Sequence, residues 1–220
     1  MKKEIYFDDT NIDKVARSFL KDIQQVVRRS TISLNLKKTA LCVIDMQNYF
    51  LNPVSHAYIP SGQAIIPKIK RLQTFFFEHD LSVIHTRHGN TKKDAFNMAK
   101  WWGRLLDRYS TDAQVIEKLA DEKAFLIDKT QYDAFYKTQL VELLKERNIS
   151  QLIITGVMTH LCAETTARSA FMQGFDVFFA IDGTATYRRE LHLASLLTLS
   201  HGFAVPVLMS SIEEQFKYVK

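Results

Sequence analysis

The chain has 220 residues, of which 46% are hydrophobic, so it is long enough to bury an ordinary core as one large domain. No run approaches the roughly 18 apolar residues that a membrane-spanning helix needs, and the opening MKKEIYFDDT lacks the apolar core of an export signal. The net charge of +5 comes from basic residues scattered among 24 acidic ones, without the basic stripe that nucleic-acid binding requires. We therefore expect a globular protein that binds neither a membrane nor nucleic acid.

Two cysteines, Cys42 and Cys162, are too few for a disulfide framework. Cys42 lies within an apolar run typical of a core strand, where a thiol acts as a small hydrophobic side chain. A reducing, cytoplasmic location is the simplest expectation.

Residues 11–29 predict an amphipathic helix, because apolar residues recur there at spacings of three and four. The apolar face comprises Ile12, Val15, Ala16, Phe19, Ile23, Val26 and Val27. We interpret residues 1–38 as an amino-terminal extension and residues 39–220 as the main domain. The helix is expected to pack on its own domain, with a subunit interface as the alternative.

From residue 39, six short apolar runs alternate with stretches of helical periodicity. The runs are ALCVID, LSVIHT, AFLID, LIITGV, DVFFAID and FAVPVL. Because they are continuously apolar, both faces of the sheet should be covered, as in a parallel sheet between helices. The pattern predicts a doubly wound α/β fold, with a six-stranded parallel sheet and helices on both faces in a Rossmann-like three-layer arrangement.

The segment 90–109 interrupts this alternation and contains Trp101 and Trp102. We interpret it as an excursion over one face of the domain. Two roles are equally favoured for this segment: it covers a ligand site, or its tryptophans merely anchor it to the protein surface.

Three polar residues follow apolar runs at what should be one edge of the sheet. Asp45 ends the first run, Lys129 follows the third, and Cys162 comes shortly after the fourth. In open α/β sheets, ligands bind beyond the carboxyl ends of the strands. Taken singly, each residue has an ordinary structural role, as a turn cap, a solvated lysine or a buried thiol. Their shared edge favours a catalytic site.

A thiol, an ammonium and a carboxylate together suit nucleophilic catalysis. Cys162 is predicted to open a helix, where unpaired N–H groups and the Lys129 ammonium would lower the pKa of its thiol. Asp45 would take the thiol proton and later deliver it to a leaving group. Backbone N–H groups from Met158 to Cys162 are candidates to bind an oxyanion. The expected intermediate is a thioester.

The segments CVIDMQNYF, DKTQYDAF and TGVMTHLCAETTARSAFMQGFDVFFAIDGTAT resemble the isochorismatase-like cysteine hydrolase superfamily over roughly residues 37–210. The resemblance implies that Asp45 is the acid and base, Lys129 the charge-stabilising residue and Cys162 the nucleophile. It also implies an isochorismatase-like sheet, a cis peptide bond between Val157 and Met158, a small-molecule substrate, and a homo-oligomer, either a dimer or a tetramer.

Two departures from family patterns narrow the expected activity. Isochorismatases typically lack the cysteine, so Cys162 favours cleavage of a C–N bond in a small amide, carbamoyl or ureido compound. Vinyl-ether hydrolysis that releases pyruvate, and a non-catalytic scaffold subunit, are the alternatives. Nicotinamidases carry a metal-binding Asp-x-His motif, but Val54 occupies the aspartate position before His56. We therefore expect no metal and no cofactor; a nucleotide-binding oxidoreductase is also disfavoured because no glycine motif is present.

Other polar residues near the same edge are weaker candidates. His85 and His88 have a spacing that could suit a metal, but chance is the better explanation. Arg87 is predicted to bind a substrate carboxylate, with a surface ion pair as its alternative role. Gln47 and Tyr132, which are close in sequence to Asp45 and Lys129, are predicted to line the substrate pocket.

Overall fold

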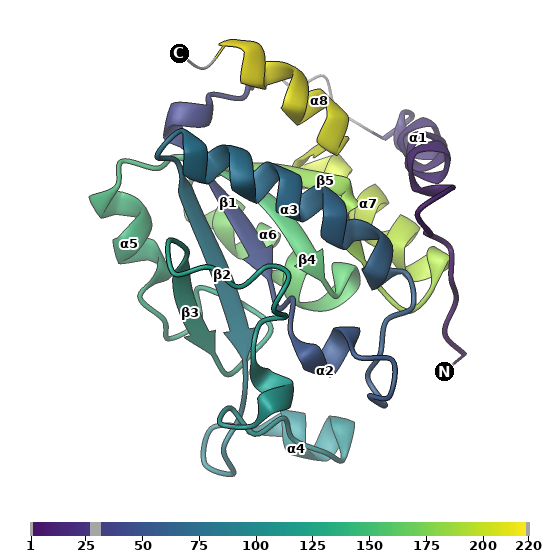
Figure 1. Ribbon diagram of the computed structural model, residues 1–220, viewed down its shortest axis with the longest axis vertical. Helices are drawn as coiled ribbons and strands as arrows, with labels where there is room; N and C mark the ends of the chain where they lie inside the picture. The colour runs from purple at the N-terminus through teal and green to yellow at the C-terminus, as the bar shows by residue number, and fades with distance from the viewer. Residues whose placement is uncertain (1, 27–31, 219–220) are drawn as a thin grey trace.

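The computed structural model describes residues 2–26 and 32–218, and a single six-stranded parallel sheet forms its centre (Figure 1). The strands are β1 (Thr39–Ile44), β2 (Ser82–His88), β3 (Phe125–Lys129), β4 (Gln151–Val157), β5 (Asp176–Ala185) and β6 (Val205–Val207). They are arranged in the order β3-β2-β1-β4-β5-β6, and every neighbouring pair is parallel. The predicted fold class and all six predicted strands are confirmed.

Helices cover both faces of the sheet. They are α1 (Ile12–Ile23), α2 (Asn48–Leu51), α3 (Gly62–Glu78), α4 (Asn97–Trp102), α5 (Leu140–Glu146), α6 (Glu164–Met172), α7 (Arg189–Gly202) and α8 (Met209–Glu214). Shorter helical turns are η1 (Leu36–Lys38), η2 (Thr111–Ala113), the π-helical η3 (Thr159–Ala163) and η4 (Gln215–Tyr218). In Figure 1, α3 lies in front of the sheet and α6 behind it, so the strands are enclosed as a doubly wound fold requires.

The central strands β1 and β4 are buried at every position, which explains why their sequences are continuously apolar. The edge strand β3 differs, because Leu126 is 48% exposed. β1 and β4 therefore lie in the interior of the sheet, whereas β3 forms one of its edges.

A glycine allows β1 and β4 to approach closely at their carboxyl ends. Gly156 has a φ of +99°, which side chains rarely tolerate, and a Cβ atom there would lie 2.0 Å from the carbonyl oxygen of Ile44. Glycine is therefore required at this position. The contact fixes the end of β1 directly before Asp45.

The amino-terminal helix is shorter than predicted, because helical hydrogen bonding stops at Ile23 and residues 24–26 form a turn. Val27 and the rest of the predicted helix lie outside the described residues. The buried face of α1 packs against α7 and β5, and Tyr6 and Phe7 before it are also buried. The extension thus contributes to the same core as the sheet.

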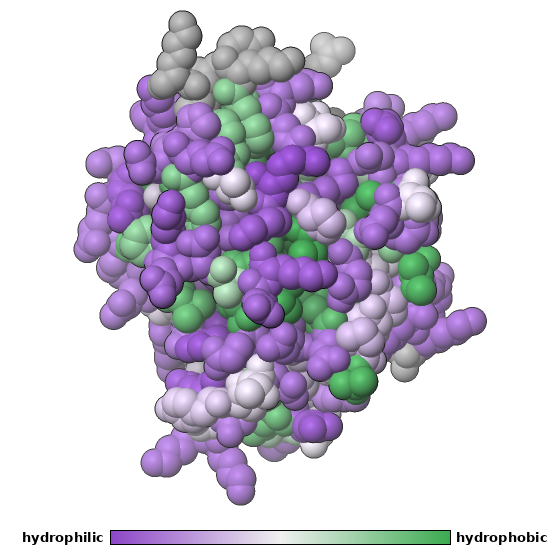
Figure 2. Space-filling view, in the orientation of Figure 1, coloured by the Kyte–Doolittle hydropathy of each residue, from purple (hydrophilic) through white to green (hydrophobic). Residues whose placement is uncertain are grey.

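Hydrophilic side chains occupy most of the face shown in Figure 2, and the apolar patches are small and scattered. Within residues 2–26 and 32–218, none of the helices has both the length and the apolar composition to cross a bilayer.

Candidate active site

The carboxyl ends of β1, β3 and β4 meet at one edge of the sheet, near α2 and α4 (Figure 1). Asp45 follows β1 directly, and Lys129 is the last residue of β3. Cys162 lies in η3, which follows β4 and leads into α6. The parallel topology therefore places residues from three distant parts of the sequence at one edge.

The three side chains are in contact. Lys129 Nζ lies 2.8 Å from Asp45 Oδ2, and both side chains are fully buried. The Cys162 thiol is within hydrogen-bonding reach of both partners and is 5% exposed. Lys129 Nζ also donates a hydrogen bond of 3.0 Å to the carbonyl oxygen of Gln131. A buried ion pair between Asp45 and Lys129 therefore lies next to the sulfur atom of Cys162.

Burial decides the protonation state of this cluster. It raises the pKa of the Cys162 thiol, and the adjacent Lys129 ammonium offsets only part of that effect. Burial alone would lower the pKa of Lys129, but Asp45 and Cys162 together raise it. The sequence-based expectation of an easily ionised thiol is therefore wrong for the resting protein. Desolvation, which sequence cannot quantify, outweighs the ammonium.

Thr86 orients Asp45 and was missed by the sequence analysis. Its hydroxyl donates a hydrogen bond of 2.5 Å to Asp45 Oδ1 and accepts one of 3.0 Å from the Asp45 backbone N–H. These bonds hold Asp45 where its φ is 47°, an unusual value for a residue other than glycine. Strand alternation could have indicated this role, because it places Thr86 and His88 on one face of the sheet and His85 and Arg87 on the other.

A cavity of about 330 Å³ opens above Cys162. Its walls include Tyr132, Met158 and Leu161, and Trp102 from the excursion. Trp102 Nε1 donates a hydrogen bond of 2.9 Å to the Tyr132 hydroxyl, which ties the excursion to the segment after β3. The neighbouring Trp101 is 79% exposed and is not part of the cavity lining.

Of the three residues predicted to contact the substrate, Gln47, Arg87 and Tyr132, only Tyr132 lines the cavity. Gln47 is fully buried, and its side-chain amide donates to the carbonyl oxygens of His88 and Ala113 and accepts from the His88 N–H. It anchors the loops behind the site. The structure therefore does not bring Gln47 to the cavity.

Arg87 lies outside the cavity as well. Its guanidinium pairs with Asp128 at 2.6 Å and donates to Gln114 at 2.9 Å, in a separate hollow that His85 also lines. Because alternate residues of a strand face opposite sides, Arg87 cannot share the side of Thr86. The alternative prediction, a surface ion pair, describes the observed contact.

The donor atoms of this site do not fit the metal centre that the nicotinamidase motif would provide. Val54 supplies no ligand and is 89% exposed. His85 Nε2 contacts Gln73 at 2.8 Å, whereas His88 lines the cavity on the other face of β2. Across the part of the chain that the structure describes, no three His, Cys, Asp or Glu side chains form a metal-binding group. We assign no chemical step to a metal.

The backbone beside Cys162 contains a cis peptide bond between Val157 and Met158. The N–H groups of Leu161 and Ala163 both donate to the carbonyl oxygen of Met158, at 3.1 and 3.2 Å. Leu161 is therefore already bonded, which narrows the set of oxyanion donors expected between Met158 and Cys162.

A buried histidine connects the amino-terminal segment to the turn that carries Cys162. His192 Nδ1 lies 3.2 Å from the Tyr6 hydroxyl and 3.0 Å from Thr159 Oγ1. The Tyr6 hydroxyl in turn accepts a hydrogen bond of 2.9 Å from the Thr186 N–H. Burial lowers the pKa of His192 to about 3, so this connection uses a neutral imidazole.

The stability of the protein is expected to fall as the pH is lowered from 6.5 towards 4. Burial holds the pKa of His85 at about 4 and that of His192 at about 3, against 6.5 in the unfolded chain. Between these values only the unfolded chain binds the protons, so acid favours unfolding by about 1.4 kcal/mol per pH unit for each histidine. Urea unfolding at several pH values measures this slope.

The matched controls for this prediction are single histidine replacements. His192→Asn should reduce the dependence of the unfolding free energy on pH below 6.5. His201→Gln, which changes an exposed histidine, should leave that dependence unchanged. A wild-type unfolding free energy that stays constant across this pH range would contradict the prediction.

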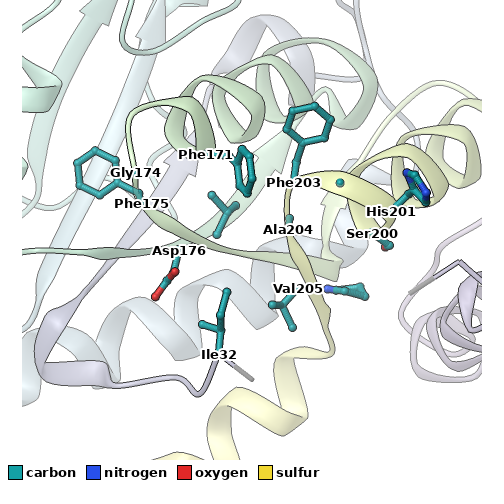
Figure 3. A pocket seen from close by; sticks show the side chains of 13 residues that line it. Ile32, Phe171, Gly174, Phe175, Asp176, Ser200, His201, Phe203, Ala204 and Val205 are labelled. Carbon is teal, nitrogen blue, oxygen red and sulfur yellow. The ribbon is translucent and has the colours of Figure 1, made fainter. Parts of the chain in front are cut away.

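A second hollow, of about 490 Å³, lies at the amino-terminal ends of β5 and β6 (Figure 3). Phe171 and Phe203 project into it with ring centroids 5.4 Å apart, and Asp176 marks the start of β5. This hollow is at the opposite end of the strands from Cys162. It therefore shares no residue with the candidate active site.

Comparisons with known proteins identify the family to which the chain belongs. The Isochorismatase domain family matches residues 39–211. The chain is 36% identical to Nicotinamidase 3 of Arabidopsis thaliana, covering 77% of this chain and 84% of that protein. It is 32% identical to Enterobactin synthase component B of Escherichia coli (strain K12), covering 73% of this chain but 57% of that protein.

A solved cysteine hydrolase from Pseudomonas syringae pv. phaseolicola 1448A superposes with a TM-score of 0.82 at 25% identity, covering 89% of this chain and 98% of that one. The shared sheet and the family match extend through β1, β3, β4 and η3, the elements that carry Asp45, Lys129 and Cys162. The chain therefore belongs to the isochorismatase-like cysteine hydrolase superfamily.

Proposed function

We propose that this protein is a cysteine amidohydrolase that cleaves a C–N bond of a small amide, carbamoyl or ureido compound. The observation that carries the proposal is the contact between Cys162, Asp45 and Lys129 at the base of a cavity. A thiol next to a carboxylate can lose its proton at the moment of attack, even though burial keeps it neutral at rest.

The first step forms a bond between Cys162 Sγ and the carbonyl carbon of the substrate. The thiol proton passes to Asp45, and the carbonyl electron pair moves onto oxygen. The Lys129 ammonium, 2.8 Å from Asp45, stabilises the negative charge of the carboxylate that accepts the proton. This division of roles agrees with the raised pKa of Lys129.

The developing oxyanion needs hydrogen-bond donors. Because the N–H groups of Leu161 and Ala163 already donate to Met158, we assign this role to the N–H groups of Met158 and Cys162. When the carbonyl re-forms, the C–N bond breaks and Asp45 returns its proton to the leaving nitrogen. The product is a thioester on Cys162 and free ammonia or amine.

Water completes the cycle. Asp45 removes a proton from a water molecule that attacks the thioester, and the departing thiolate then recovers that proton. The acyl group leaves as an acid, and the resting cluster of thiol, carboxylate and ammonium is restored. The similarity to Nicotinamidase 3 supports hydrolysis of an amide.

A second candidate is vinyl-ether hydrolysis that releases pyruvate, and the similarity to Enterobactin synthase component B favours considering it. There Asp45 would protonate the substrate and water would add to the resulting cation, without a covalent role for Cys162. The two candidates therefore differ in product and in their need for sulfur.

A substrate panel separates the candidates. Purified protein is incubated with nicotinamide, a carbamoyl amino acid, a ureido acid and isochorismate, and released ammonia and pyruvate are measured. Acid-quenched samples are analysed by mass spectrometry for an acyl adduct on Cys162. We expect ammonia together with the adduct. Pyruvate release without an adduct would support the second candidate, and no product from any compound would favour a non-catalytic subunit.

Replacing Thr86 by valine is expected to lower kcat/KM about tenfold, because Asp45 loses the hydroxyl that orients its carboxylate. Valine matches threonine in shape, so the fold should persist. The matched control is Thr155→Val, since Thr155 is equally buried but donates to the carbonyl oxygen of Cys42. Equal activities of the two variants would contradict the positioning role.

A further inference from the structure

The charged side chains that line the cavity above Cys162 are all cationic at neutral pH. Lys3 comes from the amino-terminal segment, and Arg104 comes from the excursion after α4. Among the described residues, no aspartate or glutamate is part of the lining. Two histidines, His56 and His88, also line it, and burial lowers their pKa values so that both imidazoles are neutral. The mouth of the cavity is therefore positively charged.

Lys3 has no carboxylate partner within the described part of the chain. Its ammonium donates one hydrogen bond, to the carbonyl oxygen of His56, and lies 4.6 Å from the centre of the Tyr187 ring. Two of its three N–H donors remain for a ligand. Partial burial also lowers the pKa of Lys3, as expected for an ammonium that has lost water without gaining an ion pair.

Arg104 is exposed, and none of its five N–H donors has a hydrogen-bond or ion-pair partner among residues 2–26 and 32–218. Its neighbour Arg108 differs, since that guanidinium pairs with Asp94 at 2.6 Å. Asp112 acts electrostatically on the cavity residues Tyr49 and His56 but does not itself line the cavity. Arg104 is thus available to bind an anion.

The walls between this cationic mouth and Cys162 are apolar. Phe50, Trp102, Tyr132, Met158 and Leu161 form much of the surface. Such walls favour a flat, apolar substrate body, while a charged group would be stable where the two cations lie.

We propose that Lys3 and Arg104 bind a carboxylate at the end of the substrate remote from the scissile bond. The preferred substrate is then an amide that joins a flat apolar body to a carboxylate. This inference rests on the proposed function for the scissile bond and adds the substrate class. Lys3 lies before the family match at residues 39–211, so the amino-terminal segment supplies part of the specificity.

Kinetic selectivity provides the first test. The probes are benzamide and the three positional isomers of carbamoylbenzoate, which add a carboxylate to the same ring. We expect the best isomer to have a kcat/KM about tenfold above that of benzamide. Arg104→Met and Lys3→Met should each reduce this ratio several-fold. Lys100→Met and Lys2→Met remove exposed charges from the same two segments without touching the cavity, and should preserve it.

Binding provides a second test that does not depend on turnover. Calorimetry with the Cys162→Ala protein should show that the preferred isomer binds about tenfold more tightly than benzamide, and that Arg104→Met or added salt removes the difference. The inference is overturned if every isomer binds no better than benzamide, or if Arg104→Met leaves the ratio unchanged. Charge-selective binding without turnover by wild-type protein would instead overturn the proposed function alone.

Discussion

Replacing Cys162 by alanine is expected to lower the turnover of an accepted amide by at least about a thousandfold. The side chain contributes the attacking sulfur, and neither Asp45 nor Lys129 can form the acyl intermediate in its place. The protein should remain folded, because alanine removes one buried atom and leaves the ion pair of Asp45 and Lys129 intact. Ammonia release, together with a thermal unfolding curve, measures both effects.

Cys42 offers a matched control for this replacement. It is the other cysteine of the chain and is also buried. It lies within β1, which is the neighbour of β4, the strand that leads into η3. Cys42→Ala should retain turnover, although it removes core volume and lowers stability by about 1 kcal/mol. If the two variants hydrolyse amides at similar rates, covalent catalysis by Cys162 is rejected.

Replacing Lys129 by methionine is expected to destabilise the protein by about 3–5 kcal/mol. Both side chains of the ion pair are fully buried, so removal of the ammonium leaves the Asp45 carboxylate without a charge partner. The hydroxyl of Thr86 remains as one donor, but it carries no charge. Urea unfolding measures the loss, and amide turnover should fall as well because the ammonium no longer holds the Asp45 carboxylate beside Cys162.

The double variant Asp45→Asn with Lys129→Met tests the cause of this loss. Removing both charges should restore much of the stability without restoring turnover. Lys118→Met, which changes an exposed lysine, should alter neither property. Equal destabilisation in the single and double variants would show that packing, and not the unpaired carboxylate, limits stability.

The strands and the edge where Asp45, Lys129 and Cys162 meet could be predicted because both follow from local patterns. Continuous apolar runs indicated a covered parallel sheet, and in such a sheet the carboxyl ends of the strands share one edge. No long-range information was needed.

Side-chain direction was harder to predict. His85, Arg87 and His88 lie at the end of one strand, and their nearness in sequence does not show which of them share a face of the sheet. Arg87 was predicted to reach the cavity, but it points to the other face and pairs with Asp128. Thr86, which donates a hydrogen bond to Asp45, was not predicted. Strand alternation could have separated them once one residue of β2 was placed.

The protonation of Cys162 and the contribution of Lys3 depend on packing between distant segments. Burial of the thiol results from the joint arrangement of strands, turns and excursion, and its effect on the pKa opposes that of Lys129. Lys3 reaches the cavity because Tyr6 and Phe7 are buried beside His192 near the other end of the chain. One sequence contains no local pattern for either feature.

The position of β1 in the middle of the sheet has a consequence for biosynthesis. Thr39 at the start of β1 contacts Gln151 of β4, which follows it by 112 residues. While a ribosome produces the intervening chain, one side of this apolar strand has no partner and is open to pairing with other nascent polypeptides. Chaperone capture during translation would protect that side until β4 emerges, and rapid overproduction would favour inclusion bodies.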